Sequence, residues 1–311
     1  MTLSMLITAI VALCTAVVVA MAVHAASRWL RVRRKSYGKL RIQLYERLYG
    51  LQWGDLTTNN YGFAPAEGEG QERFQLQMYK ELYKLLCARS RPQSHTKLLE
   101  VSCGRGGGLS HLLKAWPGSS SAVGLDYSAN AVRFCRQAYG HIANLAFVQG
   151  SGLELPFADE SFDVVLNVEA SHNYGDDLAF FREVNRVLRP GGMFLYSDYR
   201  RPELVAPLKQ TLREAALDGE FYDITKHVAE ACRLDSDRRR QLIRACVPWY
   251  YRIVFGKELA NYAAIKGSRK FEAFCSFQRH YYMTFAIKAD HSRDNRPAVA
   301  VVAAPPQDAK A

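Results

Sequence analysis

The sequence has little that points to a metal site or to a disulfide framework. It contains 7 cysteines among 311 residues, and none of them forms a CxxC pair or a Cys/His spacing typical of zinc binding. An odd number of unpatterned cysteines is typical of reduced thiols in the cytosol. We therefore expect no metal ion, and a cytoplasmic location for the folded part of the chain.

Charged residues are missing from one long stretch near the N-terminus. Residues 3–27 contain no Lys, Arg, Asp or Glu, and about 22 apolar residues at about 1.5 Å each form a helix of about 33 Å, enough to cross a bilayer. No Lys or Arg precedes the stretch, which argues against a cleaved signal peptide. A buried helix of the globular domain is the weaker alternative, because no polar face interrupts the run. We expect residues 1–27 to form a transmembrane anchor.

Positive charge follows this stretch at once. Seven of the Lys and Arg residues of a chain with net charge +11 lie between positions 28 and 41. The positive-inside rule then places the N-terminus outside and the catalytic domain in the cytoplasm, as a single-pass protein. A membrane surface explains this clustered charge better than nucleic acid does, so we expect a membrane partner and no nucleic acid. Residues 28–65 are expected to be a basic juxtamembrane linker and N-terminal cap.

A dinucleotide-binding fingerprint is also missing, although a glycine-rich loop is present. The loop follows an apolar run that ends near Glu100, and it leads into a helical pattern. If the G-x-G-x-x-G motif began at Gly104 or Gly106, its third glycine would fall on Leu109 or His111. This argues against an NAD-linked oxidoreductase. The loop can still approach a ligand closely and present helix N–H groups, and a tight turn without a ligand is the alternative.

A second acidic residue supports the presence of a ligand at this loop. Asp126 ends another apolar run, 22 residues after Gly104, where an acid reaches ribose hydroxyls in Rossmann-like units. Glu100, two residues before the loop, is foreign to the dinucleotide fingerprint but suits a cationic amino-acid cofactor.

Strand and helix patterns alternate along the middle of the chain. This alternation predicts an α/β fold with a doubly wound, mainly parallel seven-stranded sheet. Strands are expected at 97–101, 121–126, 145–149, 162–168 and 193–197, helices at 71–90, 107–115, 128–138 and 177–188, a helical segment at 200–270 and a last antiparallel pair within 275–288. Ligands bind at the carboxyl ends of such strands, and four polar residues lie there: Glu100, Asp126, Ser151 and Asn167.

Several motifs in order resemble those of the class I S-adenosylmethionine (SAM) methyltransferases of the type 11 group. They are Glu100–Gly106, with Ser102 in place of the first glycine, Gly124–Ser128, Gly150–Phe157 continuing into Ser161–Val165, and Arg186–Gly192. Two shorter motifs, 100–104 and 169–172, are most similar to the phthiotriol/phenolphthiotriol dimycocerosate methyltransferases. Those enzymes O-methylate a hydroxyl on a lipid of polyketide origin.

The resemblance implies a Rossmann-like methyltransferase domain at 66–288 with SAM as cofactor. Segment 200–270 would be a helical insertion on the acceptor side, and 289–311 a disordered tail. The implied cofactor-binding residues are Glu100 for the amino group, Gly104 and Gly106 for the methionyl part, Asp126 for the ribose, Ser151 for the adenine amino group, and also Ser102, Tyr127, Gly152, Asn167 and Tyr61.

The acceptor side carries one candidate base and several aromatic residues. His172 follows the strand at 162–168 and could take the proton of a hydroxyl acceptor, although it could equally hydrogen-bond its own loop. Asn59–Phe63 is either a cover over the cofactor or a surface turn. The aromatic residues 249–251 and Tyr262 either line an acceptor pocket or pack in the core.

These patterns together predict a membrane-anchored methyltransferase that moves a methyl group from SAM to a lipophilic small molecule at a hydroxyl oxygen. The alternatives are N- or C-methylation of a lipid or secondary metabolite, and a non-catalytic membrane scaffold that keeps the SAM fold.

Overall fold

The computed structural model describes residues 56–289 of the chain. The anchor expected at 1–27, the linker up to residue 55 and the tail from residue 290 lie outside the described residues. Within 56–289, no helix is both long and apolar enough to cross a membrane.

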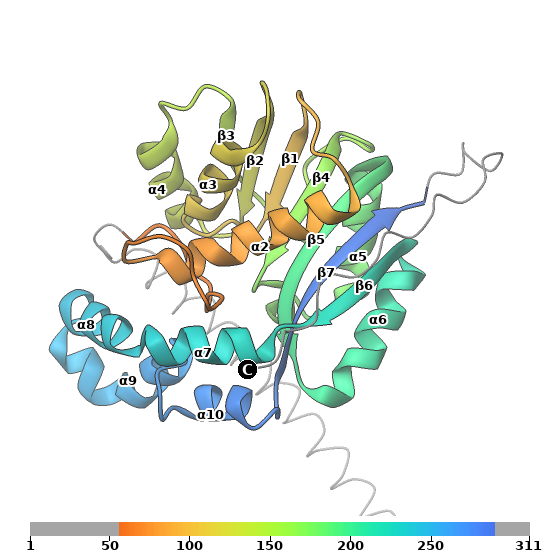
Figure 1. Ribbon diagram of the computed structural model, residues 1–311. Coiled ribbons are helices and arrows are strands. Elements are labelled where there is room, and N and C mark those ends of the chain that lie inside the picture. The colour runs from red at the N-terminus through yellow and green to blue at the C-terminus, as the bar shows by residue number, and fades with distance from the viewer. Residues whose placement is uncertain (1–55, 290–311) are drawn as a thin grey trace, which may run out of the picture. The chain divides into compact units, whose positions relative to one another are not determined.

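A seven-stranded sheet forms the centre of the fold, in the order β3-β2-β1-β4-β5-β7-β6 (Figure 1). Its strands are β1 (Lys97–Val101), β2 (Ser121–Asp126), β3 (Leu145–Gln149), β4 (Phe162–Val168), β5 (Leu188–Arg200), β6 (Leu217–Asp223) and β7 (His280–Lys288). Strand β7 runs antiparallel to both of its neighbours, β5 and β6, and the ladders among β1 to β5 are parallel. The predicted mainly parallel seven-stranded sheet is confirmed.

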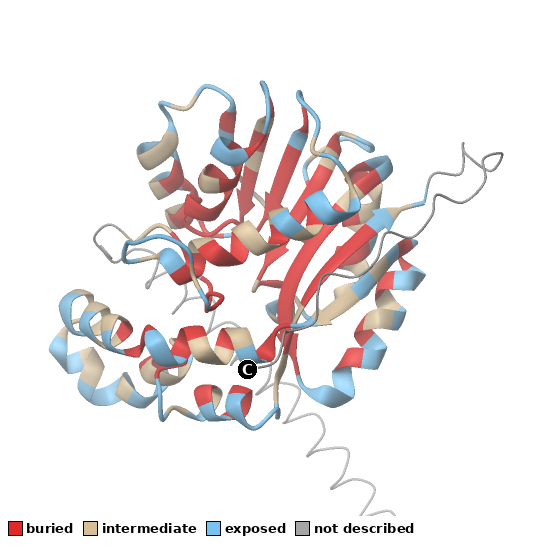
Figure 2. Cartoon of the chain, viewed as in Figure 1, coloured by how far each residue is buried: buried red, intermediate tan, exposed pale blue. Residues whose placement is uncertain are grey.

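Apolar clusters cover both faces of the sheet. Leu98 packs in one cluster and its neighbour Leu99 in the other, because successive side chains of a strand point to opposite faces. The first cluster includes residues of α2 (Arg73–Arg89), α3 (Gly107–Ala115) and α4 (Ala129–Tyr139), and the second those of α5 (Asp177–Val187) and α6 (Val205–Glu214). The central strands are accordingly buried (Figure 2).

Short polar residues set where two of these helices begin. The Ser128 side chain accepts a hydrogen bond from Ala131 N at 3.2 Å before α4, and Asp176 accepts one from Ala179 N at 2.9 Å before α5. These caps satisfy donors that the first helical turn leaves without an internal partner. Helix α4 follows β2 directly, and α5 follows β4 after the turn η1, so both caps lie on connections that leave the carboxyl ends of strands.

Three expectations need correction. Segment 200–270 is not wholly helical, because it contains β6, which pairs with β7. Strand β5 begins at Leu188 rather than at 193. The turn expected at 190–192, from the motif Arg186–Gly192, is instead part of this strand, whose pairing with β4 is irregular there, and Gly191 takes φ 73°. The segment expected as a final strand pair from 275 starts as the end of α10 (Arg269–Cys275), and the strand begins at His280.

Four helices near the C-terminal part of the chain lie together at one end of the sheet (Figure 1). They are α7 (Thr225–Leu234), α8 (Ser236–Cys246), α9 (Trp249–Tyr262) and α10. Two 3-10 turns complete the elements: η1 (Ser171–Asn173) after β4 and η2 (Pro202–Leu204) after β5.

Candidate active site

The ends of β1 and β2 meet at the glycine-rich loop, as predicted. Gly104 N donates to Asp126 Oδ2 at 2.9 Å, and Ser128 N donates to Asp126 Oδ1 at 2.9 Å. The carboxylate is 6% exposed, and each of its oxygens can accept a further bond. Asp126 therefore holds the loop against β2, and its carboxylate can also accept hydrogen bonds from hydroxyl groups.

Glu100 is buried beside this loop and keeps one oxygen without a partner. Tyr79 Oη donates to Glu100 Oε1 at 2.7 Å, whereas Oε2 has no hydrogen-bond partner within the described part of the chain. Burial raises the pKa of Glu100 to about 8, even though the Tyr79 hydrogen bond lowers it. A cationic amino group placed at Oε2 would satisfy that oxygen and favour the charged carboxylate.

The first turn of α3 is covered by an upstream segment, which the sequence patterns did not predict. Gly106 begins the helix at φ 75°, a conformation that suits glycine. Gly107 N donates to Thr57 O at 3.0 Å, so this helix N–H is already used. A Cβ at Gly107 would lie 2.3 Å from Thr57 Oγ1, and Glu72 holds Thr57 through its backbone N at 2.8 Å. The cluster of glycines therefore serves close packing as well as ligand approach.

Tyr174 joins three of the predicted cofactor residues. Its hydroxyl lies 2.6 Å from Ser102 Oγ and accepts from Asn167 Nδ2 at 3.0 Å. A Cβ at Gly152 would contact the Tyr174 ring at 3.1 Å. Ser102 itself takes φ 60°, in the left-handed region that glycine favours, at the position where the motif of the resemblance has a glycine. Asn167 Oδ1 is buried and, among the described residues, has no hydrogen-bond partner.

Two predicted residues lie at the margin of this arrangement. Tyr127 is 60% exposed after β2. Ser151 Oγ accepts from Leu153 N at 3.1 Å within its own turn. The structure brings neither side chain into contact with Glu100 or Asp126 by a described hydrogen bond, so their adenine-side roles stay predictions.

Tyr61 belongs to a buried cover rather than to a surface turn. Its backbone N donates to Glu169 Oε1 at 2.6 Å, and its hydroxyl donates to Tyr262 O at 2.9 Å. Its ring centroid lies 5.9 Å from that of Tyr199. The segment around Tyr61 is therefore packed against Glu169, Tyr199 and the end of α9, and its role as a cofactor-binding residue stays a prediction.

His172 is held by a buried carboxylate. Its Nδ1 lies 2.7 Å from Asp198 Oδ1, and its backbone N donates to Asp198 Oδ2 at 3.0 Å. Arg200 Nη1 lies 3.0 Å from the same Oδ2. Burial raises the pKa of Asp198, but the charges of His172 and Arg200 outweigh it, and the net shift is downward. An ionised, acceptor-only carboxylate accepts a hydrogen bond from Nδ1–H, so Nε2 is the ring nitrogen that faces away from Asp198.

A phenol and an ammonium group continue this chain of contacts. Tyr199 Oη lies 3.0 Å from His172 Nε2, and Lys270 Nζ lies 3.3 Å from Tyr199 Oη and 2.5 Å from Tyr61 Oη. Burial raises the pKa of Tyr199, and Asn173 Nδ2 is a second neighbour of His172 Nε2, at 2.9 Å. Asp198, His172, Tyr199 and Lys270 form one connected polar chain.

Glu169 adds a second buried carboxylate next to this chain. It takes φ 53° and accepts from Tyr281 Oη at 2.7 Å. Burial raises its pKa to about 7, although the hydrogen bonds from Tyr281 and from Tyr61 N lower it. The backbone in the left-handed region and the shifted pKa are both features that concentrate at functional sites.

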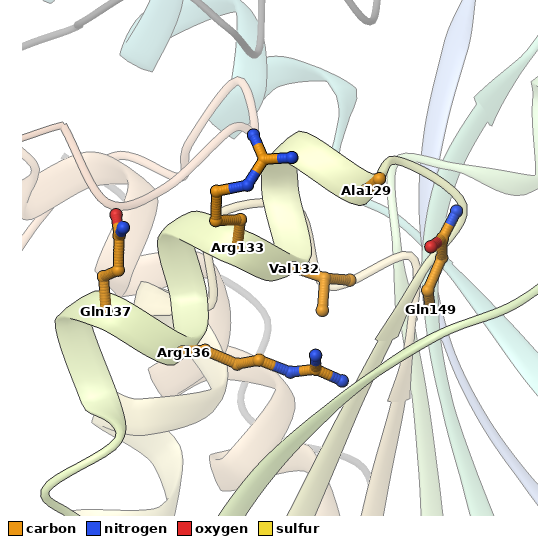
Figure 3. Close-up of a pocket in the computed structure, with 6 residues that line it drawn as sticks. All are labelled: Ala129, Val132, Arg133, Arg136, Gln137 and Gln149. Carbon is orange, nitrogen blue, oxygen red and sulfur yellow. The ribbon is translucent and has the colours of Figure 1, made fainter.

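A pocket at the edge of the sheet adjoins the predicted cofactor residues Asp126 and Tyr127, because Gln149 in its lining pairs with Asp126 and donates to Tyr127 O at 3.3 Å. It is lined by residues of α4 and the end of β3: Ala129, Val132, Arg133, Arg136, Gln137 and Gln149 (Figure 3). The Arg136 guanidinium donates to Phe147 O at 2.9 and 3.1 Å, so it holds α4 against β3. None of the predicted cofactor residues lines this pocket.

Sequence reasoning missed Tyr79, Tyr174, Asp198, Tyr199 and Lys270. Asp198 had a usable signal, since it lies near the carboxyl end of a parallel strand like Asp126. Tyr79 and Lys270 reach the site from helices far away in the chain, and no local pattern marks them.

Comparison with known proteins agrees with this geometry. Residues 99–196 match the model of the Methyltransferase domain family. The chain is 37% identical over 189 residues to the phthiotriol/phenolphthiotriol dimycocerosates methyltransferase of Mycobacterium tuberculosis, covering 60% of this chain and 69% of that protein. It is 37% identical over 175 residues to the fatty-acid O-methyltransferase of Mycolicibacterium smegmatis, covering 54% of this chain and 61% of that protein. It thus spans about three fifths of the length of some curated relatives.

A solved geranyl diphosphate methyltransferase in complex with SAM shares the fold, with a TM-score of 0.55 and 16% identity, over 75% of this chain and 100% of that one. The chain belongs to the family of SAM-dependent methyltransferases. The residues fit the cofactor. Glu100 Oε2 and Asn167 Oδ1 are buried acceptors without a partner in the described structure, and Asp126 stands beside the loop as a ribose ligand should.

Proposed function

We propose that the protein is a membrane-anchored methyltransferase that transfers a methyl group from SAM to a hydroxyl oxygen of a lipophilic small molecule. The observation that supports it most directly is the pair His172 and Asp198, joined at 2.7 Å and connected to the cofactor loop. The connection runs through η1, because Tyr174 follows this turn and hydrogen-bonds Ser102 at 2.6 Å. A candidate base and the cofactor loop are therefore fixed relative to each other.

When bound, SAM supplies an activated methyl group, and the remaining work is to position the acceptor and to take its proton. His172 Nε2 is the proton acceptor in this proposal. Asp198 keeps the proton on Nδ1 and stabilises the imidazolium that forms. Tyr199 Oη and Asn173 Nδ2 lie 3.0 and 2.9 Å from Nε2, and an acceptor hydroxyl would take a place beside Nε2 that these two groups hold in the structure. Tyr61 and its neighbours would exclude water from the acceptor side.

The lipophilic acceptor is supported by the relatives. Both curated relatives are named for lipid acceptors, a dimycocerosate precursor and a fatty acid. The candidate base His172 supports a hydroxyl rather than a carboxylate as the group that receives the methyl. A carboxylate is already ionised at neutral pH and needs no proton removed, whereas a neutral alcohol does.

Membrane anchoring by residues 1–27 is the remaining part of the proposal. It is supported by the uncharged stretch at 3–27 and by the seven cationic residues at 28–41. This orientation would place the catalytic domain in the cytoplasm.

The test measures whether the full-length protein, reconstituted into lipid bilayers, forms a methylated product. A long-chain secondary alcohol, a long-chain fatty acid and a long-chain amine would each be incubated with SAM. Mass spectrometry would then look for an added methylene in each product. Methylation of the alcohol supports the proposal. Methylation of the amine alone would favour an N-methyltransferase, and failure with all three despite SAM binding would favour the scaffold alternative.

A further inference from the structure

Helix α9 exposes an unusual amount of apolar surface. Of its 14 residues only Leu259 is buried. Four large side chains are more than half exposed, and we call them the α9 patch: Trp249 (65%), Tyr250 (53%), Ile253 (74%) and Val254 (67%). Figure 2 shows the helix mostly in the colours of exposed and intermediate residues. A contiguous exposed apolar surface of this kind marks an interaction site.

Positive charge borders the patch. Three of the four arginines of α8 form ion pairs, Arg238 and Arg239 with Asp235 and Arg240 with Asp237. The charges left beside the patch are Arg244, Arg252 and Lys257, against the single acid Glu258. Arg244 and Lys257 are exposed. Arg252 Nη1 donates to Arg244 O at 3.0 Å, which keeps this guanidinium at the junction of the two helices. The border of the patch is therefore cationic.

This composition fits an anionic lipid surface better than a second protein. Trp and Tyr prefer the boundary between headgroups and acyl chains. Ile253 and Val254 supply the apolar contact, and Arg and Lys supply the attraction to anionic lipids. The patch therefore combines positive charge that complements an anionic leaflet with side chains that prefer the boundary between headgroups and acyl chains.

The opposite end of α9 reaches the candidate active site. Tyr262, its last residue, accepts from Tyr61 Oη through its carbonyl at 2.9 Å, and its hydroxyl accepts from Asn59 Nδ2 at 3.3 Å. Tyr61 in turn packs against Tyr199, the partner of His172. The two helical stretches of α9, which meet at a kink at Phe255, therefore link the exposed patch to the segment around Tyr61.

We propose that the α9 patch docks on an anionic membrane surface and that the lipophilic acceptor passes from this leaflet to His172 along α9. The docking is a contact additional to the anchor at 1–27. The passage of the acceptor rests on the proposed function, but the docking does not.

The test measures the depth of Trp249 in the full chain reconstituted into vesicles. The chain has 4 tryptophans. The fluorescence of Trp249 is therefore obtained as the difference between the wild-type chain and Trp249→Phe, in which the other tryptophans are unchanged. Vesicles of phosphatidylglycerol and phosphatidylcholine are prepared with and without brominated acyl chains, which quench tryptophan on contact. Neither SAM nor an acceptor is added, so a failure of the proposed chemistry cannot affect the result.

We expect bromolipids to quench the Trp249 signal in anionic vesicles. The Ile253→Glu/Val254→Glu variant, compared with the same variant carrying Trp249→Phe, should lose this quenching because its patch is charged. Leu204→Glu is the matched control, since Leu204 is an exposed apolar residue (41%) of η2, and it should keep the quenching.

A Trp249 signal that bromolipids do not quench would overturn the docking. If that signal is also shielded from aqueous acrylamide, the cover is protein, either the N-terminal segment of this chain or a second copy. Quenching in the wild type that persists in Ile253→Glu/Val254→Glu would equally contradict a role of the patch.

Discussion

His172 and Asp198 are bound to each other through two contacts, Nδ1 to Oδ1 at 2.7 Å and the His172 backbone N to Oδ2 at 3.0 Å. The carboxylate thus fixes both the ring and the turn that carries it. Asp198 is buried, and Arg200 holds its other side at 3.0 Å. In the proposed reaction this arrangement would orient Nε2 of His172 for proton transfer.

The first prediction concerns the base. His172→Ala should lower the rate with a long-chain alcohol by roughly 10²–10⁴-fold, the usual contribution of general base catalysis, while SAM affinity stays nearly unchanged. The same variant should lose far less activity on a fatty acid, because a carboxylate needs no base. Initial rates on the two acceptors and calorimetric SAM titration check this. His141→Ala, at an exposed position away from the site, is the control, and a loss below about threefold for His172→Ala on the alcohol would remove the base role.

Asp198 should act through His172, as the residue that positions it. Asp198→Asn keeps the shape but can donate to Nδ1 and so stabilise the tautomer with its proton on Nε2. We expect the alcohol rate to fall by roughly 10²-fold or more, with the SAM dissociation constant unchanged. A parallel drop in thermal stability large enough to unfold the protein at the assay temperature would mean that the effect is structural, and circular dichroism at that temperature separates the two.

The third prediction concerns the cofactor. Asp126→Ala should weaken SAM binding by about tenfold or more, since charge-assisted hydrogen bonds contribute about 1.5–3 kcal/mol each. Asp126 also accepts from Gly104 N, so Asp126→Asn, which can still accept one bond, should weaken binding less than Asp126→Ala. Asp159→Ala at an exposed position serves as the control. Unchanged affinity in a calorimetric titration would exclude Asp126 from the site.

A pH dependence follows from Glu100. Its folded pKa is raised to about 8 by burial, so the protonated form is favoured in the folded state. The carboxyl therefore costs no stability below its unfolded pKa near 4.3 and an increasing amount as the pH rises toward 8. Glu100→Gln should gain stability relative to the wild type between pH 5 and pH 9, measured without SAM by thermal unfolding. The exposed Glu154→Gln variant should show no such trend. A difference in stability between Glu100→Gln and the wild type that does not change with pH would contradict the buried carboxyl.

The fifth prediction concerns the anchor. A chain that begins at Tyr37 should be soluble or only peripherally bound, should still bind SAM, and should lose activity mainly on acceptor presented in membranes. Each Lys or Arg near an anionic leaflet adds about 1 kcal/mol of attraction, so the basic flank helps to hold the domain at the cytoplasmic face. Extraction of the full-length protein by high salt alone, or digestion of the catalytic domain by protease outside intact cells, would contradict this.

Local patterns in the sequence were enough to place much of the fold. Strands β1, β2, β3 and β4 begin and end at the predicted residues, because buried parallel strands are short apolar runs bounded by turn residues. Gly104 and Asp126 were also predictable as neighbours, since adjacent parallel strands end at the same edge. Strand β6 was missed because Leu217–Asp223 carries four charged or glycine residues on a half-exposed edge, and only its pairing with β7 makes it a strand.

The sequence by itself therefore determined the strands β1 to β4 with the helices between them, the glycine-rich loop and the acids at the strand ends. Only the tertiary structure decided which side chains meet there. Asp198 reaches His172 because β4 and β5 pair with Val168 beside Ser197, and Thr57 covers Gly107 because Glu72 holds it over the loop. Such contacts depend on strand register and on the docking of distant segments. These are set by packing over the whole domain, and no local spacing of residues records them.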